Sequence, residues 1–131
     1  MSPENVERYG RMAVAWQRGD LEAWLDDAQD GELRTSGEFP GFEPVYRGRD
    51  GLRAFWDLWR APWSDFHTDI ARIQDVGGRY LALLTMRGVG RESGAEVELK
   101  WAHVVTEENG FFRFDSYPGW EQALEAVGLS E

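Results

Sequence analysis

Apolar residues recur at helical spacing through the first quarter of the chain. Ser2 and Pro3 supply a hydroxyl N-cap and a proline in the first turn, a pattern typical of a helix start. Gly19 is expected to end this helix, and Asp20 to cap a second, shorter helix that stops near Gly31. The apolar stripe of the first helix consists of Val6, Tyr9, Ala13 and Trp16, and that of the second of Leu21, Trp24, Leu25 and Ala28.

The next segment combines a short strand, a loop and a third helix. Residues 32–35 predict the strand, and residues 36–48, dense in glycine and proline, predict the loop. Asp50 is expected to cap a helix that Pro62 ends, because proline disfavours the helical conformation in the residue before it. The apolar face of this helix has i, i+3, i+4, i+7 spacing and consists of Leu52, Phe55, Trp56 and Trp59.

The second half of the chain changes to the alternating pattern of strands. Glycine-containing turns typical of hairpins separate four predicted strands at residues 66–75, 79–88, 96–107 and 111–117. A last short helix is predicted over residues 121–127. Because no repeat or linker divides the sequence, residues 1–131 predict a single α+β domain with helices on one face of an antiparallel sheet.

The composition adds a heavy aromatic content and a strong negative charge. The chain has 7 Trp, 7 Phe and 4 Tyr, and each such ring buries roughly 150–250 Å². The interior is therefore expected to be built largely from rings, which form either a solid core or the wall of a cavity. With 24 acidic and 14 basic residues the net charge is −10, and this field repels nucleic acid and anionic lipid.

Several other classes of protein or site lack support in the sequence. The arginines at positions 47, 49 and 53 are interrupted by glycine and aspartate and are interpreted as a solvated rim. No cysteine is present, which excludes disulfides and thiol nucleophiles. His67 and His103 are far apart in the chain and form no zinc-binding pattern, so neither a metal nor a cofactor is expected. There is no signal-like or membrane-spanning apolar run, and the cytoplasm is the expected location.

Four segments resemble a known family in order and spacing. They read RGDLEAWLDDAQD, GEFPGFEPVYRGRDGLRAFW, VELKWAHVVTEENG and RFDSY…EQALEAVGL, and the likeness runs from about Glu4 to Leu129. The chain resembles the SnoaL-like branch of the NTF2-like superfamily. The resemblance implies a cone in which a strongly curved antiparallel sheet, with helices on its concave side, encloses a pocket. It also implies a homodimer that forms through the outer face of the sheet.

His103 is the leading candidate for chemistry. Along residues 96–107, alternation places Trp101 and His103 on one face and the charged residues on the other, so His103 should point inward. Histidine titrates near neutral pH, so an inward histidine in an apolar pocket is a candidate acid or base. The alternative is a core histidine that serves packing.

The residue opposite His103 depends on the turn that follows. In the cyclases of the family, a histidine at this place accompanies an acid–base aspartate, and Ser116 stands where that aspartate would be, beside Asp115. A two-residue turn sets His103 opposite Ser116, whereas a three-residue turn sets it opposite Asp115. The first register buries two phenylalanines and exposes Arg113 and Asp115, which is favoured because burying unpaired charge costs several kcal/mol. Both registers stay open, and both His103 and Asp115 are candidate catalytic residues.

The pocket is expected to be lined by rings and a few polar groups. The candidates are Trp16, Tyr46, Phe55, Trp56, Trp59, Trp101, His103 and Ser116. Two hypotheses follow. One is a cofactor-independent enzyme of the isomerase, cyclase, hydratase or hydrolase type that acts on a small hydrophobic molecule. The other is a non-catalytic ligand-binding or assembly module.

Overall fold

One six-stranded sheet organises the described part of the chain. The computed structural model describes residues 2–28, 30–36, 39–108 and 110–129. In chain order the elements are α1 (Pro3–Arg18), α2 (Leu21–Ala28), β1 (Glu32–Thr35), β2 (Val45–Arg47), α3 (Gly48–Arg60), β3 (Trp63–Asp75), β4 (Tyr80–Gly90), β5 (Glu96–Glu108), β6 (Phe111–Tyr117) and α4 (Trp120–Ala126). The strand order is β2-β1-β6-β5-β4-β3. The predicted α+β class is confirmed.

The first two helices begin where the sequence predicts, and α1 also ends there, whereas α2 ends at Ala28, before the predicted stop near Gly31. The Ser2 side chain accepts a hydrogen bond from the Asn5 amide at 3.2 Å, and Gly19 takes a left-handed conformation, φ 74°, at the end of α1. Asp20 caps α2 by accepting from the Ala23 amide at 3.2 Å. α3 differs, because it begins at Gly48 and Asp50 lies inside its first turn. Asp50 is therefore not the cap.

A short strand lies inside the segment predicted to be a loop. β2 pairs antiparallel with β1, and Leu33 lies opposite Tyr46. Tyr46 is buried, with its ring centre 5.4 Å from that of Phe55. The strand has only three residues, and its partner β1 lies on the other side of the intervening loop, so local glycine and proline content does not reveal it. The part of the predicted loop at residues 37–38 lies outside the described residues.

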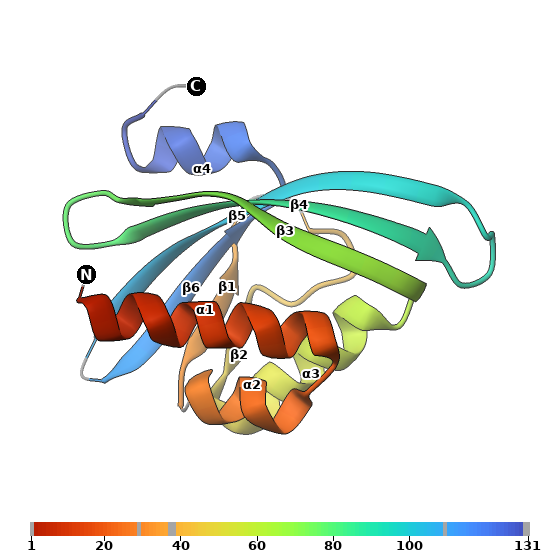
Figure 1. Ribbon diagram of the computed structural model, residues 1–131, viewed down its shortest axis with the longest axis horizontal. Helices are drawn as coiled ribbons and strands as arrows, with labels where there is room; N and C mark the ends of the chain where they lie inside the picture. The colour runs from red at the N-terminus through yellow and green to blue at the C-terminus, as the bar shows by residue number, and fades with distance from the viewer. Residues whose placement is uncertain (1, 29, 37–38, 109, 130–131) are drawn as a thin grey trace.

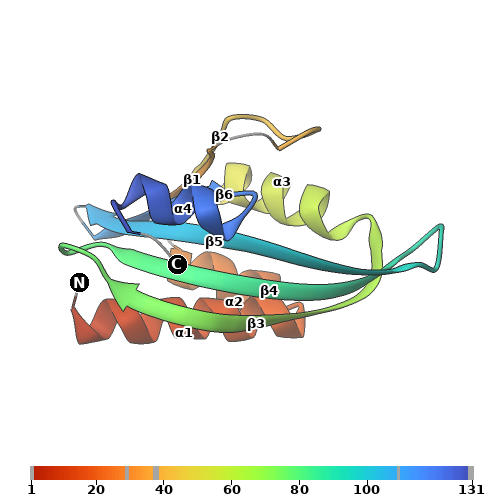
Figure 2. The same ribbon diagram turned by 90° about the horizontal axis from the view of Figure 1, so that it is seen from above.

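The helices lie on both faces of the sheet, not on one. Figures 1 and 2 show α1, α2 and α3 on one side and α4 alone on the other. α4 packs Ala123 and Leu124 onto a small second core formed by Leu81, Leu83, Ala102 and Val104. The sheet also contains one parallel pair, β1 with β6. The face that carries α1, α2 and α3 is called the inner face below.

The turn between β5 and β6 gives the favoured register. His103 lies opposite Ser116, Val104 opposite Asp115 and Glu108 opposite Phe111. Phe112, Phe114 and Ser116 are consequently buried on the inner face. This is the pairing of the two-residue turn, in which Asn109 itself lies outside the described residues.

A buried arginine ties α1 to the rest of the inner layer. The Arg8 guanidinium donates to the carbonyl of Asp27 and, at 3.1 Å, to the carbonyl of Gly110. It also lies 3.9 Å from the centre of the Phe112 ring, and burial lowers the pKa of Arg8. These contacts fix α1 against α2 and the β5–β6 turn. They set the position of the next residue, Tyr9.

Candidate functional site

The inner face of β5 carries the predicted row of side chains. Trp101, His103 and Val105 are buried there, whereas Glu98 and Lys100 on the outer face are exposed. Ala102 and Val104 also point outward, but α4 covers them. The alternation of side chains along residues 96–107 therefore predicted the face of His103 correctly.

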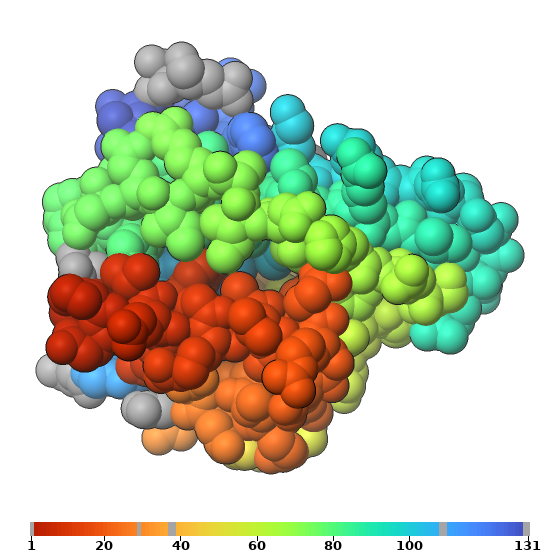
Figure 3. Space-filling model, viewed as in Figure 1, coloured from red at the N-terminus to blue at the C-terminus, as the bar shows by residue number. Residues whose placement is uncertain are grey.

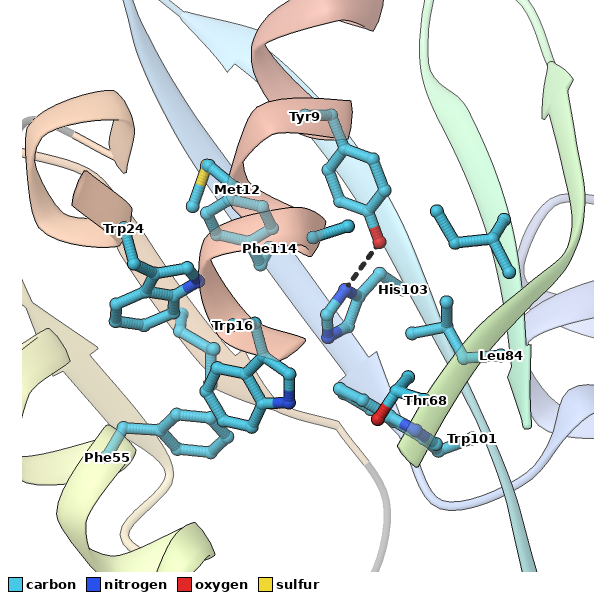
Figure 4. Close-up of a pocket in the computed structure, with 13 residues that line it drawn as sticks. Tyr9, Met12, Trp16, Trp24, Phe55, Thr68, Leu84, Trp101, His103 and Phe114 are labelled. Atoms are coloured by element: carbon cyan, nitrogen blue, oxygen red, sulfur yellow. Dashed lines mark hydrogen bonds between the residues drawn. The ribbon is translucent and has the colours of Figure 1, made fainter. Parts of the chain in front are cut away.

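His103 borders a cavity between the sheet and the helices. The cavity has a volume of about 60 Å³, and Figure 4 shows its wall. It is lined by residues from eight elements: Tyr9, Met12, Ala13, Trp16, Trp24, Leu33, Phe55, Thr68, Ile70, Leu84, Trp101, His103 and Phe114. Most of these side chains are apolar, and none of the described lining residues is acidic.

A tyrosine from α1 hydrogen-bonds the imidazole of His103. The Tyr9 hydroxyl lies 3.1 Å from His103 Nδ1, as Figure 4 shows. The two rings meet edge to face, with an interplanar angle of 86°. Both residues are buried.

Burial controls the ionisation of this pair. It lowers the pKa of His103 from 6.5 to about 3, because charging the ring in an apolar site is unfavourable. It also raises the pKa of Tyr9 for the same reason. At neutral pH both groups are therefore uncharged. Hydrogen bonding, not ion pairing, is the chemistry that this pair offers.

The structure does not bring Asp115 to His103. Asp115 lies on the outer face, where Arg113 Nε is 3.2 Å from its carboxylate. The neighbouring residue on the inner face, Ser116, is buried opposite His103 but does not line the cavity. The alternative register, which would set His103 opposite Asp115, is therefore not the one that forms, and Asp115 faces away from His103 because one step along a strand reverses the side chain.

Half of the predicted pocket residues line the cavity. Trp16, Phe55, Trp101 and His103 belong to its wall. Tyr46 packs behind Phe55, while Trp56 and Trp59 pack behind Trp16 at ring-centre distances of 4.9 and 5.1 Å. All three are buried and are core residues rather than wall residues.

Two polar wall residues were not among the predictions. Tyr9 lies seven residues before Trp16 in the same apolar stripe, so it occupies the same helix face. Thr68 follows Phe66 by two residues in β3 and precedes Ile70 by two, so alternation puts the three on one side. Both signals are present in the sequence. They identify a face but not which of its residues reach a cavity.

The cavity lies near a recess between α1 and the edge strand β3. Figure 3 shows this recess, with atoms from later in the chain visible at its floor. Gln17 bridges the two elements, since its side-chain oxygen accepts from the Thr68 amide at 2.6 Å and its nitrogen donates to the Phe66 carbonyl at 3.2 Å. The Gln17 side chain thus forms hydrogen bonds with the β3 backbone that a neighbouring strand would form elsewhere in the sheet.

The charged groups elsewhere form ordinary surface pairs. Arg49 contacts Glu22 at 2.5 Å, Arg53 contacts the same carboxylate at 3.2 Å, and Arg47 contacts Glu32 at 2.6 Å. His67 is exposed and pairs with Asp69. Among the described residues there is no cluster of metal-binding side chains and no helix long and apolar enough to cross a bilayer.

The comparisons identify the family. The model of the SnoaL-like domain matches residues 6–113. The chain belongs to the SnoaL-like family. A search of curated proteins gives no significant match.

Three solved structures with the same fold cover 95%, 98% and 99% of the SnoaL-like chain. An NTF2-like protein of unknown function from Burkholderia pseudomallei K96243 is 25% identical, with a TM-score of 0.76 and 98% of each chain covered. TerC, co-crystallised with polyporic acid, is 16% identical, with a TM-score of 0.75 and coverage of 95% of this chain and 98% of TerC. A ketosteroid isomerase-like protein from Catenulispora acidiphila DSM 44928, in complex with trimethylamine, is 15% identical, with a TM-score of 0.70 and coverage of 99% and 96%.

Proposed function

We propose that this SnoaL-like protein binds a small, mainly apolar molecule in the cavity beside His103. The observation that carries the proposal is the cavity itself, whose wall combines rings from α1, α2, α3 and the sheet with a buried histidine. Pockets of this kind, apolar with few polar groups, are the usual sites of small-molecule binding. The ligands crystallised with TerC and with the Catenulispora protein support small-molecule binding on this fold.

The ionisation of His103 limits the chemistry that the pocket can perform. With a pKa of about 3 the ring is a weak base at neutral pH and carries no proton to give away as an imidazolium. No described wall residue is acidic. We therefore favour ligand binding, with His103 as a neutral hydrogen-bonding group, over a proton shuttle between His103 and a carboxylate.

Calorimetric titration with ethylbenzene and acetophenone tests the proposal. Saturable binding of at least one of these compounds, at one molecule per chain, is the expected result. Ala13→Leu puts a larger side chain into the cavity wall and should lower that affinity about five- to a hundredfold, since overfilling packed space costs roughly 1–3 kcal/mol.

Val14→Leu is the matched control for this experiment. Val14 is the next residue of the same helix and is 55% exposed, so the same isobutyl group there should leave the affinity unchanged. No saturable binding of either compound would contradict the proposal. If both variants lowered the affinity equally, the binding site would lie outside this cavity.

A further inference from the structure

The exposure of the wall residues shows where the cavity comes nearest to solvent. Of the 13 residues that line it, ten are buried, Ala13 and Thr68 are half-buried, and Ile70 is 38% exposed. The three that reach solvent belong to α1 and β3. The recess between α1 and β3 in Figure 3 is therefore the side on which the cavity wall is thinnest.

The seam between α1 and β3 is held beside this place but not at it. Gln17 hydrogen-bonds the β3 backbone at Thr68. Ile70 follows Thr68 by two residues on the same face of β3, and Ala13 precedes Gln17 by one helical turn on α1. Ala13 and Ile70 consequently lie beyond the part of the seam that Gln17 holds.

The backbone of β3 is loosely paired at Ile70. β3 is an edge strand of the sheet, so a strand lies on one side of it only. Its register with β4 shifts between Ile70 and Arg72, as at a β-bulge, and Ile70 pairs with the buried wall residue Leu84. A bulge interrupts the ladder of hydrogen bonds, and segments with fewer such bonds open at lower cost. Exposed side chains also change rotamer within nanoseconds.

We propose that ligands enter and leave the cavity through the seam between α1 and β3, and that the Ile70 side chain closes this mouth. The inference rests on the proposed function, because a mouth serves a cavity that takes a ligand. Ile70 then controls how fast the cavity fills and empties, and Gln17 restrains the opening of the seam.

The other side of the cavity that borders a surface hollow is closed by two large rings. Trp101 lines both the cavity and a surface groove that also contains Leu99. Trp101 is 8% exposed, and its ring centre lies 5.7 Å from that of Trp59, which is also buried. Opening this side requires the displacement of buried indoles, whereas the α1–β3 side requires the movement of one partly exposed aliphatic side chain.

Stopped-flow tryptophan fluorescence with acetophenone measures the two rate constants, since Trp16 lines the cavity. Ile70→Ala should raise both the association and the dissociation rate constant about five- to tenfold, because a closed mouth slows binding as well as release. A residue that only contacts the ligand changes mainly the dissociation rate constant. The association rate constant therefore separates a gate from a contact.

Ile73→Ala is the matched control. Ile73 lies on the same strand and is 39% exposed, but it does not line the cavity, so both rate constants should stay within about twofold. Gln17→Leu provides a second, independent variant. Gln17 is not part of the cavity wall, so its loss should raise both rate constants and leave the affinity within about twofold.

The outcomes distinguish this inference from the function on which it rests. A rise in the dissociation rate constant alone in Ile70→Ala would overturn the inference and leave the binding site intact. Faster exchange in Leu99→Ala but not in Ile70→Ala would also overturn it, since the ligand would then enter from the groove. If calorimetry detected no binding of acetophenone to the unmodified protein or to Ile70→Ala, both the inference and the binding of this ligand in the cavity would be overturned.

Discussion

At the scale of single residues, the Tyr9–His103 pair holds most of the chemistry of the site. Burial keeps the ring neutral, with a pKa of about 3 in place of 6.5. Between these values the unfolded chain binds a proton at His103 that the folded chain does not. The free energy of unfolding should therefore fall as the pH drops through this window, and the His103 contribution should be constant above it.

His103→Asn tests this linkage, because the shorter amide still offers an oxygen to Tyr9. We expect the free energy of unfolding of the variant to depend less steeply on pH between about 6.5 and 4 than that of the unmodified protein. Urea denaturation at several pH values measures the difference. His67→Asn, at an exposed position, is the control and should keep the steeper slope. If the free energy of unfolding changed equally with pH in His103→Asn and in the unmodified protein, burial would not be what keeps His103 neutral.

Tyr9→Phe isolates the hydrogen bond to Nδ1. The variant keeps the ring against Phe114 but leaves His103 Nδ1 without its partner, which should cost about 1–3 kcal/mol in the free energy of unfolding. Tyr80→Phe is a matched comparison, since the Tyr80 hydroxyl is buried and has no partner among the described residues. Removing that hydroxyl should cost nothing or be stabilising. A cost for Tyr80→Phe as large as that for Tyr9→Phe would contradict this assignment.

At the scale of the elements, alternation was the most informative feature of the sequence. It placed His103 on the inner face and, with the cost of burying charge, favoured the register that sets His103 opposite Ser116. It could not place α4 on the outer face, because an alternating strand does not show which helix will cover it. It also gave no sign of β2, because that strand has only three residues and pairs with β1 across the intervening loop.

The β5–β6 register makes a prediction for Asp115. Asp115→Asn removes a carboxylate that faces away from the cavity, so the affinity for acetophenone should stay within about twofold. Loss of its partly exposed ion pair with Arg113 should cost no more than about 1 kcal/mol in the free energy of unfolding. Calorimetry and urea denaturation measure the two effects. A tenfold loss of affinity would mean that Asp115 acts in the pocket.

The bridge between α1 and β3 makes a second prediction at this scale. Gln17→Leu removes both hydrogen bonds to the β3 backbone, so the Thr68 amide should exchange with solvent more rapidly because its acceptor is gone. Arg18→Leu, at the next and exposed position of α1, should not change that rate. Exchange at Thr68 that is equally slow in all three proteins would show that Gln17 does not hold this edge.

At the scale of the whole molecule, the sheet separates two environments. Its inner face holds the ring-walled cavity, and its outer face carries α4 beside exposed charged side chains such as Arg87 and Glu98, which lie 3.8 Å apart. The homodimer implied by the family stays a prediction. Because each protomer carries a net charge of −10, two protomers repel one another, and raising the salt from about 0.05 to about 0.5 M should strengthen the dimer by screening that repulsion. Sedimentation at each salt concentration measures the fraction of dimer. A monomer at every protein concentration would contradict the expected homodimer.

The central claim, that the cavity beside His103 is the binding site, is tested most directly by intermolecular nuclear Overhauser effects with bound acetophenone. Contacts are predicted between its protons and those of Ala13, Trp16 and His103, which border one space. Contacts instead with Phe42, Leu58 and Leu99, which line a separate surface groove, or the absence of any contact at saturating acetophenone, would contradict the account.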